Sequence, residues 1–328
     1  MNRKFIARQL ILEAKRLLAA GKDDSDYVYD PYHKHKPKGG HWEKTEKGWS
    51  QKKEEKNQNL SNLSRKQLSE TIANKDTSSD ILEEISKRNY PVTLRRLIPK
   101  HPNVSSDTLK KLSKDKDDRI RENVASNSNT PKETLYELSS DKNEVVRTRV
   151  AGNINTPIET LKKLSEDEGN YREIQYAVGR NPNTPIETLE KLSDQENPYD
   201  KPRRGVAENP NAPTDILSRL SKDPVDGVRC SVASNRKTSP EILEKLASDN
   251  YYAVRRNVAS NPETPNKTLQ KLLKDKDKDV VFEAIKNVDY SDDLINMSNY
   301  SPEFIEQLNG MDPEDFKKFI GWLRERKG

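Results

Sequence analysis

Histidine and cysteine are the side chains in this sequence that most often carry metal or nucleophilic chemistry. His33, His35 and His41 lie close together near the N-terminus, but no cysteine or acid completes a zinc-ligand spacing around them. Cys230 is the only cysteine, and the sequence contains no glycine-rich phosphate loop, no nucleophile elbow and no zinc motif. We therefore expect no metal, no cofactor and no catalytic residue, and predict that the protein is not an enzyme.

Arginine recurs at regular intervals, and an aspartate often stands six residues before it. The pairs are Asp115 and Arg121, Asp141 and Arg147, Asp223 and Arg229, and Asp249 and Arg255. Because guanidinium groups pair well with carboxylates, we interpret the pattern as a structural Asp/Arg ladder that ties each unit to the next. A basic stripe that faces a polyanion is the alternative interpretation. The residues best placed for nucleic-acid contact are then the second basic residues beside the ladder: Arg96, Arg149, Arg204 and Arg256.

A repeat positions these residues. The phrase VASNSNTPKETLYEL returns six times in variant form, and one asparagine of it recurs every 26 or 28 residues at Asn127, Asn153, Asn181, Asn209, Asn235, Asn261 and Asn287. His101 and Asn74 occupy the equivalent place in two earlier units. A period of this length is typical of stacked helical repeats, and about eight units fit within residues 61–290.

Each unit predicts two short helices. The first begins at a threonine suited to capping, as in Thr130, with proline next and an acid three residues after the cap, and then carries leucines three apart. The second begins near the ladder aspartate and ends at the recurring asparagine, a residue that tolerates left-handed backbone. Helices of about two turns are unstable alone, so stability must come from stacking.

Two units differ from the rest by insertions, EDEGNYREIQYAV and DQENPYDKPRRGV. In the first of them Gln175 stands where other units have the ladder arginine, and both lose the six-residue spacing. We interpret the insertions as small loop extensions, with a local bend or a partner-specific feature as the alternative.

Composition and charge restrict the class of protein. The 328 residues include 34% charged and 31% apolar residues, which disfavours a single thick core, and no stretch is apolar enough to span a membrane. Residues 1–60 carry 14 Lys or Arg and 9 Asp or Glu, so residues 61–328 carry 45 of each and are neutral. A neutral segment such as residues 61–328 binds nucleic acid only if its basic residues cluster on one face. The single cysteine and the lack of a secretory signal suggest a soluble intracellular protein, either cytoplasmic or virion-associated.

The repeated phrase resembles the leucine-rich repeat variant family and, more broadly, HEAT-like repeats, over roughly residues 64–290. The resemblance implies an all-α solenoid, a right-handed superhelix of paired helices in which one helix can be partly 3₁₀. An iron–sulfur module that precedes such repeats in that family is not expected here, because Cys230 is the only cysteine. HEAT-like arrays also include DNA glycosylases, but the neutral body disfavours that activity.

The two ends differ from the repeats. Residues 1–20 predict an amphipathic helix, residues 21–60 a basic and aromatic extended arm, and residues 291–328 a helical cap over the last repeat. Within the arm we expect partner contacts at Tyr32, His41, Trp42 and Trp49, since exposed aromatic residues often anchor interfaces. Folding of both tryptophans onto the first repeat is the alternative. The first 60 residues weakly resemble proteins encoded by bacteriophages.

These observations predict a noncatalytic scaffold for protein–protein interaction, or a structural component of a larger assembly such as a virion. The alternative is a HEAT-like array that binds nucleic acid through the basic arm and the exposed arginines.

Overall fold

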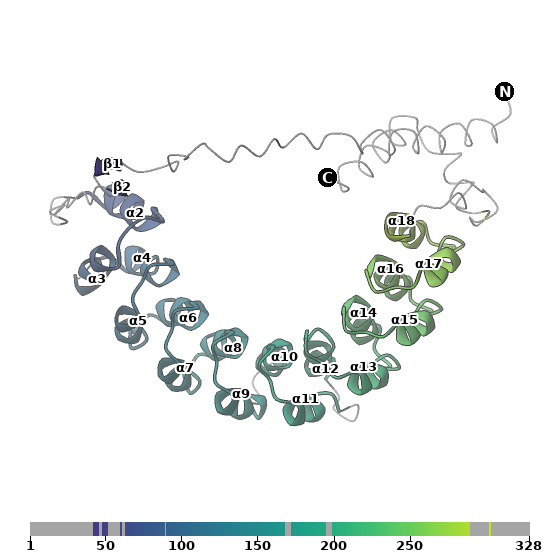
Figure 1. Ribbon diagram of the computed structural model, residues 1–328. Helices are drawn as coiled ribbons and strands as arrows, with labels where there is room; N and C mark the ends of the chain where they lie inside the picture. The colour runs from purple at the N-terminus through teal and green to yellow at the C-terminus, as the bar shows by residue number, and fades with distance from the viewer. Residues whose placement is uncertain are drawn as a thin grey trace.

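The chain folds into a curved array of helix pairs. The computed structural model describes residues 42–45, 48–51, 60, 63–88, 90–167, 172–194, 199–288 and 302. Within them, seventeen α-helices, α2 to α18, follow one another along an open arc (Figure 1). The helix predicted at residues 1–20 lies outside the described residues, and so does the cap at 291–328 apart from residue 302.

The arc has two layers. After α2 (Arg65–Ala73), the convex layer consists of α3 (Ser79–Lys87), α5 (Ser106–Leu112), α7 (Lys132–Leu138), α9 (Ile158–Ser165), α11 (Ile186–Leu192), α13 (Thr214–Leu220), α15 (Pro240–Leu246) and α17 (Asn266–Leu272). The concave layer consists of α4 (Val92–Arg95), η3 (Ile98–Lys100), α6 (Asp118–Ser126), α8 (Glu144–Gly152), α10 (Glu173–Arg180), α12 (Asp200–Ala207), α14 (Asp226–Ser234), α16 (Tyr252–Ser260) and α18 (Lys278–Asn287).

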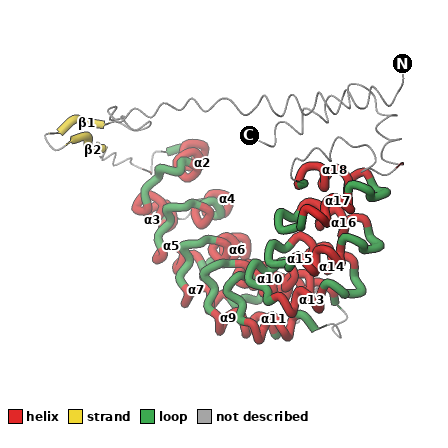
Figure 2. The backbone as a smooth tube through the Cα atoms, turned by 45° about the vertical axis from the view of Figure 1, so that its right-hand side comes forward, coloured by secondary structure: helices red, strands yellow, loops and turns green. Residues whose placement is uncertain are grey.

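Short loops join the helices wherever the structure describes the connection (Figure 2). The part of the chain that the structure describes thus contains eight helix pairs, α3/α4 to α17/α18, and is an all-α solenoid. Both helices of every pair from α5/α6 onward are α-helical, while the first pair ends in the 3₁₀ helix η3.

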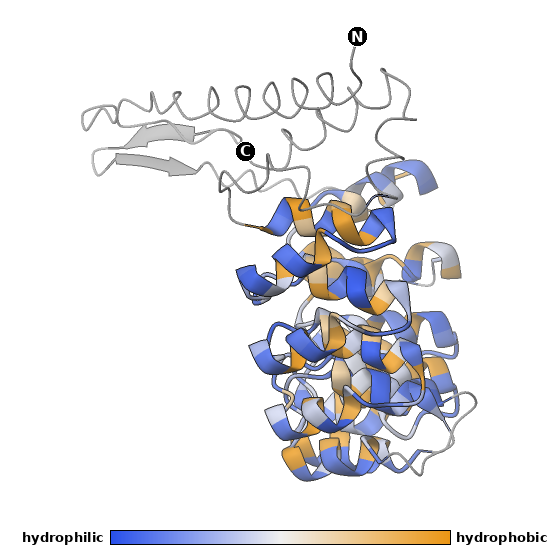
Figure 3. Cartoon of the chain, turned by 90° about the vertical axis from the view of Figure 1, so that its right-hand side faces the viewer, coloured by the Kyte–Doolittle hydropathy of each residue, from blue (hydrophilic) through white to orange (hydrophobic). Residues whose placement is uncertain are grey.

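The core lies between the two layers. Each convex helix from α5 onward buries two leucines three residues apart, such as Leu135 and Leu138, and α3 buries Leu82 and Ile85 at the same spacing. The concave helices bury an aliphatic stripe, such as Ile120 and Val124. Apolar residues alternate with polar ones along the helices that face the viewer in Figure 3. Full burial of one such side chain contributes about 1.5–3 kcal/mol. Because each pair buries its stripe against its neighbours, the core is one continuous ribbon.

The recurring asparagines hold neighbouring turns together. Asn209 Nδ2 donates to the carbonyl oxygens of Gly179 at 2.6 Å and Asn181 at 2.8 Å in the preceding unit, and Asn209 Oδ1 accepts from the backbone N–H of Asn211 at 2.8 Å. The expectation of left-handed backbone was wrong. Asn127, Asn153, Asn181, Asn235 and Asn261 are extended, as Asn235 shows with φ −75° and ψ 126°, whereas Asn287 is the last residue of helix α18. Their side-chain hydrogen bonds give the turn its recurring geometry.

His101 takes the place of this asparagine in the first pair. Its Nδ1 accepts from the backbone N–H of Asn103 at 3.0 Å, which leaves the proton on Nε2 to reach the carbonyl oxygen of Asn74 at 2.9 Å. The imidazole therefore reproduces both the acceptor and the donor of the asparagine amide, in agreement with the sequence alignment of the units.

The threonines do not cap the convex helices as predicted. Thr130 donates its hydroxyl to the carbonyl oxygen of Val124 at 2.6 Å, at the end of the preceding concave helix, and Pro131 occupies the cap position without a side-chain hydrogen bond. The acid in the first turn, Glu133, remains there and complements the helix dipole. A complete capping box occurs at Ser64 and Gln67, at the start of α2.

The concave helices α10 and α12 approach each other closely. A Cβ atom on Gly179 would lie 2.8 Å from the backbone nitrogen of Val206, and one on Gly205 would collide with the carbonyl oxygen of Tyr176. Glycine at both positions therefore allows the two backbones to touch. This contact lies between the two units that carry the insertions.

A hairpin precedes the array. Strands β1 (Trp42–Thr45) and β2 (Gly48–Gln51) are antiparallel, with Trp42 opposite Gln51 and Lys44 opposite Trp49. The hairpin lies within the segment predicted as an extended arm, and the residue pattern of that segment does not predict these strands. Farther along, Leu60 is buried in the core and its carbonyl oxygen accepts from the Tyr90 hydroxyl at 3.3 Å.

Candidate partner-binding surface on the concave face

The ladder arginines bind two adjacent interhelical turns. Arg121 donates from Nε to Asp141 Oδ2 at 2.6 Å and from Nη2 to Asp141 Oδ1 at 2.9 Å, and its Nη1 donates to the carbonyl oxygen of Asp115 at 2.9 Å. The predicted pairing of Asp115 with Arg121 thus involves a backbone carbonyl, and the carboxylate partner belongs to the next unit. Asp115 Oδ1 meanwhile accepts from the backbone N–H of Asp117 at 2.9 Å.

The same geometry recurs along the array. The pairs with a carboxylate of the next unit are Arg95–Asp115, Arg121–Asp141, Arg147–Asp167, Arg203–Asp223, Arg229–Asp249 and Arg255–Asp275. From Arg121 onward, each of these arginines also donates from Nη1 to a backbone carbonyl oxygen, so its guanidinium is held on both sides and is not available as part of a basic stripe. Gln175 interrupts the series, and its Nε2 donates to the carbonyl oxygen of Ser165 at 2.9 Å.

Acid is expected to weaken the ladder. Burial by itself raises the pKa of Asp141 and Asp249, but hydrogen bonds from Arg121, Arg229 and nearby backbone amides outweigh burial and hold each pKa below its ordinary value. Such a carboxylate adds stability above its unfolded pKa of about 3.9 and loses that stability as the pH falls through the lower folded pKa. The urea midpoint should therefore be steady near neutral pH and fall below about pH 4.

The matched control is Asp249→Asn, which removes one titrating carboxylate from the ladder. This variant should begin less stable than the natural chain and lose less stability on acidification. An acid dependence identical to that of the natural chain would contradict the role given to the Asp249 carboxylate.

The four arginines considered for nucleic-acid contact lie on concave helices or at the end of one, in different surroundings. Arg96 follows α4 and forms a double hydrogen bond with Asp117 at 3.0 and 2.6 Å, whereas Arg149 pairs with Glu122 at 3.0 Å and keeps 53% of its side chain exposed. Arg204 is half-buried, and Arg256 is exposed. Together they do not form one cluster, because each belongs to a different unit of the arc.

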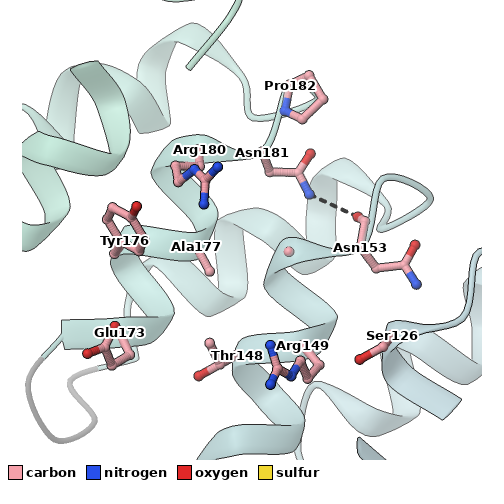
Figure 4. A pocket seen from close by; sticks show the side chains of 11 residues that line it. Ser126, Thr148, Arg149, Asn153, Glu173, Tyr176, Ala177, Arg180, Asn181 and Pro182 are labelled. Atoms are coloured by element: carbon pink, nitrogen blue, oxygen red, sulfur yellow. Dashed lines mark hydrogen bonds between the residues drawn. The ribbon is translucent and has the colours of Figure 1, made fainter. Parts of the chain in front are cut away.

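A hollow of about 540 Å³ opens where α6, α8 and α10 face the inside of the arc (Figure 4). It is lined from three successive units by Ser126, Thr148, Arg149, Gly152, Asn153, Glu173, Tyr176, Ala177, Arg180, Asn181 and Pro182. Ser126, Arg149, Gly152 and Arg180 are the exposed members of this lining, whereas Asn153 and Asn181 are buried at its floor by their hydrogen bonds to the preceding unit. Small residues make the space, because a Cβ atom on Gly152 would find nothing within 4 Å.

The guanidinium groups of Arg149 and Arg180 give the hollow its positive charge. Arg180 keeps 56% of its side chain exposed, lies over the Tyr176 ring with Cζ 5.6 Å from the centroid, and pairs through Nε with Glu208 Oε2 at 3.0 Å. The pKa of the Tyr176 hydroxyl is raised by burial and by its 2.7 Å hydrogen bond to the same carboxylate. Glu173 is the carboxylate that lines the hollow, and it pairs with Lys201.

No described residues form a metal site or a reactive thiol. Among them, no group of three or more His, Cys, Asp and Glu side chains is arranged to hold an ion. Burial and the charges of Asp226 and Asp249 raise the pKa of Cys230, so little thiolate forms at neutral pH. Over the same residues, the helices are too short or too polar to cross a bilayer.

The partner contacts predicted in the arm are only partly described. Tyr32 and His41 lie outside the described residues, and Trp42 and Trp49 lie in the hairpin strands. Sequence analysis missed Tyr176 and Arg180 as surface candidates. The available signal was the altered unit EIQYAVGR after the first insertion, which supplies most of one wall of the hollow.

Comparison with solved structures finds similar chains at low sequence identity. A leucine-rich repeat variant with a novel repetitive motif is 21% identical, with a TM-score of 0.42, over 64% of this chain and 82% of that one. An engineered protein is 17% identical, with a TM-score of 0.31, over 78% and 81% of the two chains. A second is 16% identical, with a TM-score of 0.18, over 72% and 98%. No family model and no curated protein matches the chain.

The class of protein therefore follows from the helix order and packing of the chain itself. It is a helical-repeat solenoid with a preformed hollow on its concave side. The three similar structures lend no support to the resemblance of the first 60 residues to bacteriophage proteins.

Proposed function

We propose that this protein is a noncatalytic scaffold that binds another protein on the concave face of its solenoid. The observation that carries the proposal is the hollow between α6, α8 and α10, which is lined mostly by polar and charged side chains. The asparagine bonds and the Arg/Asp ladder fix successive units relative to each other, so the surface is in place before a partner arrives. A surface that is already ordered loses little conformational entropy on binding.

A narrower form of the proposal gives the scaffold a second contact through the arm and a structural place in a larger assembly, such as a virion. The tryptophans of the hairpin, Trp42 and Trp49, are suited to that contact, because large aromatic residues commonly anchor interfaces.

Nucleic-acid binding is less well supported by the concave surface. Glu122, Glu173 and Glu208 are interleaved with the basic residues of α6, α10 and α12, and Glu122 and Glu208 pair with Arg149 and Arg180. A phosphate chain that followed the arc would meet these carboxylates repeatedly. Such binding depends on clustered cations and weakens steeply with salt.

Capture from a nuclease-treated extract of the source tests the proposal with the full chain. The Gly152→Phe variant places a ring in the hollow without removing a charge, while Gln270→Phe adds the same ring, also without removing a charge, at an exposed position of α17 on the convex side. We expect a defined protein to accompany the natural chain and Gln270→Phe, and to be reduced about tenfold or more with Gly152→Phe. A Trp42→Ala/Trp49→Ala variant measures the contribution of the hairpin.

Two results would oppose the proposal. One is capture that is unchanged by Gly152→Phe, which would move the binding surface away from the concave face. The other is capture that disappears on nuclease treatment, which would favour the nucleic-acid alternative. Circular dichroism of each variant would show whether its helices are intact.

A further inference from the structure

We infer that the hollow binds an extended peptide segment of the partner that carries an aspartate or glutamate next to aliphatic residues. The inference rests on the proposed scaffold function and adds the chemistry of the ligand. The carboxylate would be held between Arg149 and Arg180, and the aliphatic residues would contact the neighbouring turns at the edge of the arc.

Arg149 and Arg180 can accept a new carboxylate at little cost. Each extends from a different helix into the lining of the hollow, each is more than half exposed, and each contacts one glutamate at 3.0 Å, Glu122 or Glu208. A guanidinium has five N–H donors, so one such contact leaves others for a ligand. Exposed ion pairs contribute little to stability, and their exchange for a partner carboxylate disturbs the fold little.

The ion pairs already present indicate a carboxylate ligand. The groups that Arg149 and Arg180 bind in the folded chain are carboxylates, whose planar geometry matches the guanidinium fork. Glu173 also lines the hollow, and it would repel a phosphate with its larger charge more strongly than it would repel one carboxylate.

Exposed aliphatic side chains follow the lining residues along the chain, on the turn after α8 and at the starts of the convex helices α9 and α11. Ile154 follows the lining residue Asn153, and its carbonyl oxygen accepts from Asn183 Nδ2 at 2.5 Å, which places two adjacent turns together. Ile158 and Ile186 begin the neighbouring helices α9 and α11 at equivalent positions. The exposed fractions of Ile154, Ile158 and Ile186 are 58%, 49% and 55%. Exposed apolar residues that recur on neighbouring units suit contact with a protein better than contact with a phosphate backbone.

A displayed library of random peptides, selected on the full chain, tests the inference without knowledge of the natural partner. We expect the enriched peptides to share an acidic residue beside leucine, isoleucine or valine. The affinity of one synthesised peptide is then measured for the natural chain, Arg149→Ala/Arg180→Ala and Gly152→Phe. Each variant should bind about tenfold to a hundredfold more weakly. Arg256→Ala, which removes an exposed concave arginine from a distant unit, should bind normally.

A peptide with the acid replaced by its amide separates a direct contact from a general charge effect. If the acid meets Arg149 and Arg180, its replacement should weaken binding to the natural chain and have little further effect on the double variant, since coupled contacts are not additive. Additive losses would overturn the inference.

The remaining outcomes distinguish the inference from the proposed function. Enriched peptides that lack an acid, or that bind all variants equally, overturn the inference and leave a peptide-binding scaffold. Failure to enrich any peptide, with binding of a labelled thymidine oligonucleotide that falls steeply with salt, overturns both.

Discussion

Replacement of Asp223 by alanine is expected to lower the free energy of unfolding by about 3–5 kcal/mol. Asp223 is fully buried and accepts hydrogen bonds from Arg203 at 2.7 and 3.3 Å, while the Arg203 side chain is only 3% exposed. Asp223 Oδ1 also accepts from the backbone N–H of Val225 at 2.9 Å. Removal of the carboxylate therefore leaves a buried guanidinium and a backbone donor without this partner, at a joint between two units.

The matched comparison is Asp249→Ala. Asp249 has the same two roles, toward Arg229 and the backbone N–H of Tyr251, but the Arg229 side chain is 17% exposed. Because water can solvate Arg229 more readily than Arg203, Asp249→Ala should lower the free energy of unfolding by less than Asp223→Ala does. Urea unfolding followed by far-ultraviolet circular dichroism measures both. Equal losses would mean that burial does not control the strength of the ladder, and a loss below about 1 kcal/mol for Asp223→Ala would contradict the argument.

The position of the lost contact also matters for cooperativity. In a linear array, each unit contacts only its neighbours, so a weakened joint near the middle can let the two halves unfold separately. We expect hydrogen exchange in Asp223→Ala to accelerate first in α12, α13 and α14, which flank the joint.

The helical-repeat architecture was predictable because the same residue pattern returns in each unit. The regular return of the asparagine, the leucine pairs and the short apolar stripes determined the number of helices and their stacking, since helices this short require neighbours. The role of Asn209 was not predictable. Its two acceptors lie 28 and 30 residues earlier, and only stacking brings them near.

The ladder shows a limit of reasoning from sequence spacing. The carboxylate that binds Arg121 belongs to Asp141, which is the equivalent of Asp115 one repeat later. In a periodic sequence both aspartates recur in step with the arginine, so spacing alone cannot decide which copy makes the ion pair. The distance between stacked turns decides which aspartate binds the arginine.

The hollow depends on exceptions to the repeat. Gly152 stands where other units have serine or a charged residue, and Tyr176 and Arg180 occur together in one unit. Such departures are visible in the sequence. The volume of the hollow, however, also depends on the orientation of the large side chains around it, which the sequence does not give. The insertion beside this unit was interpreted first as a small loop extension, and the structure places the hollow and the close contact of α10 with α12 next to it.

The same chemical change is expected to have opposite effects at two glycines of the concave layer. Gly205→Ala places a Cβ atom against the carbonyl oxygen of Tyr176 and 3.0 Å from its carbonyl carbon, so α12 must move away from α10. Forced overpacking of this kind costs about 1–3 kcal/mol. Gly152→Ala adds its methyl group to open space, and alanine favours the helix by up to about 1 kcal/mol.

Thermal or urea unfolding of the two variants should therefore show a loss for Gly205→Ala and a gain for Gly152→Ala. A gain at both positions would mean that α10 and α12 separate without cost, and the close contact would then have no structural role. If the loss occurs, separation of these helices should also change the wall of the hollow, because Tyr176 belongs both to that wall and to the contact with Gly205. Peptide affinity should then fall in Gly205→Ala even under conditions in which the variant is fully folded, which links the backbone contact of two units to the shape of the binding surface.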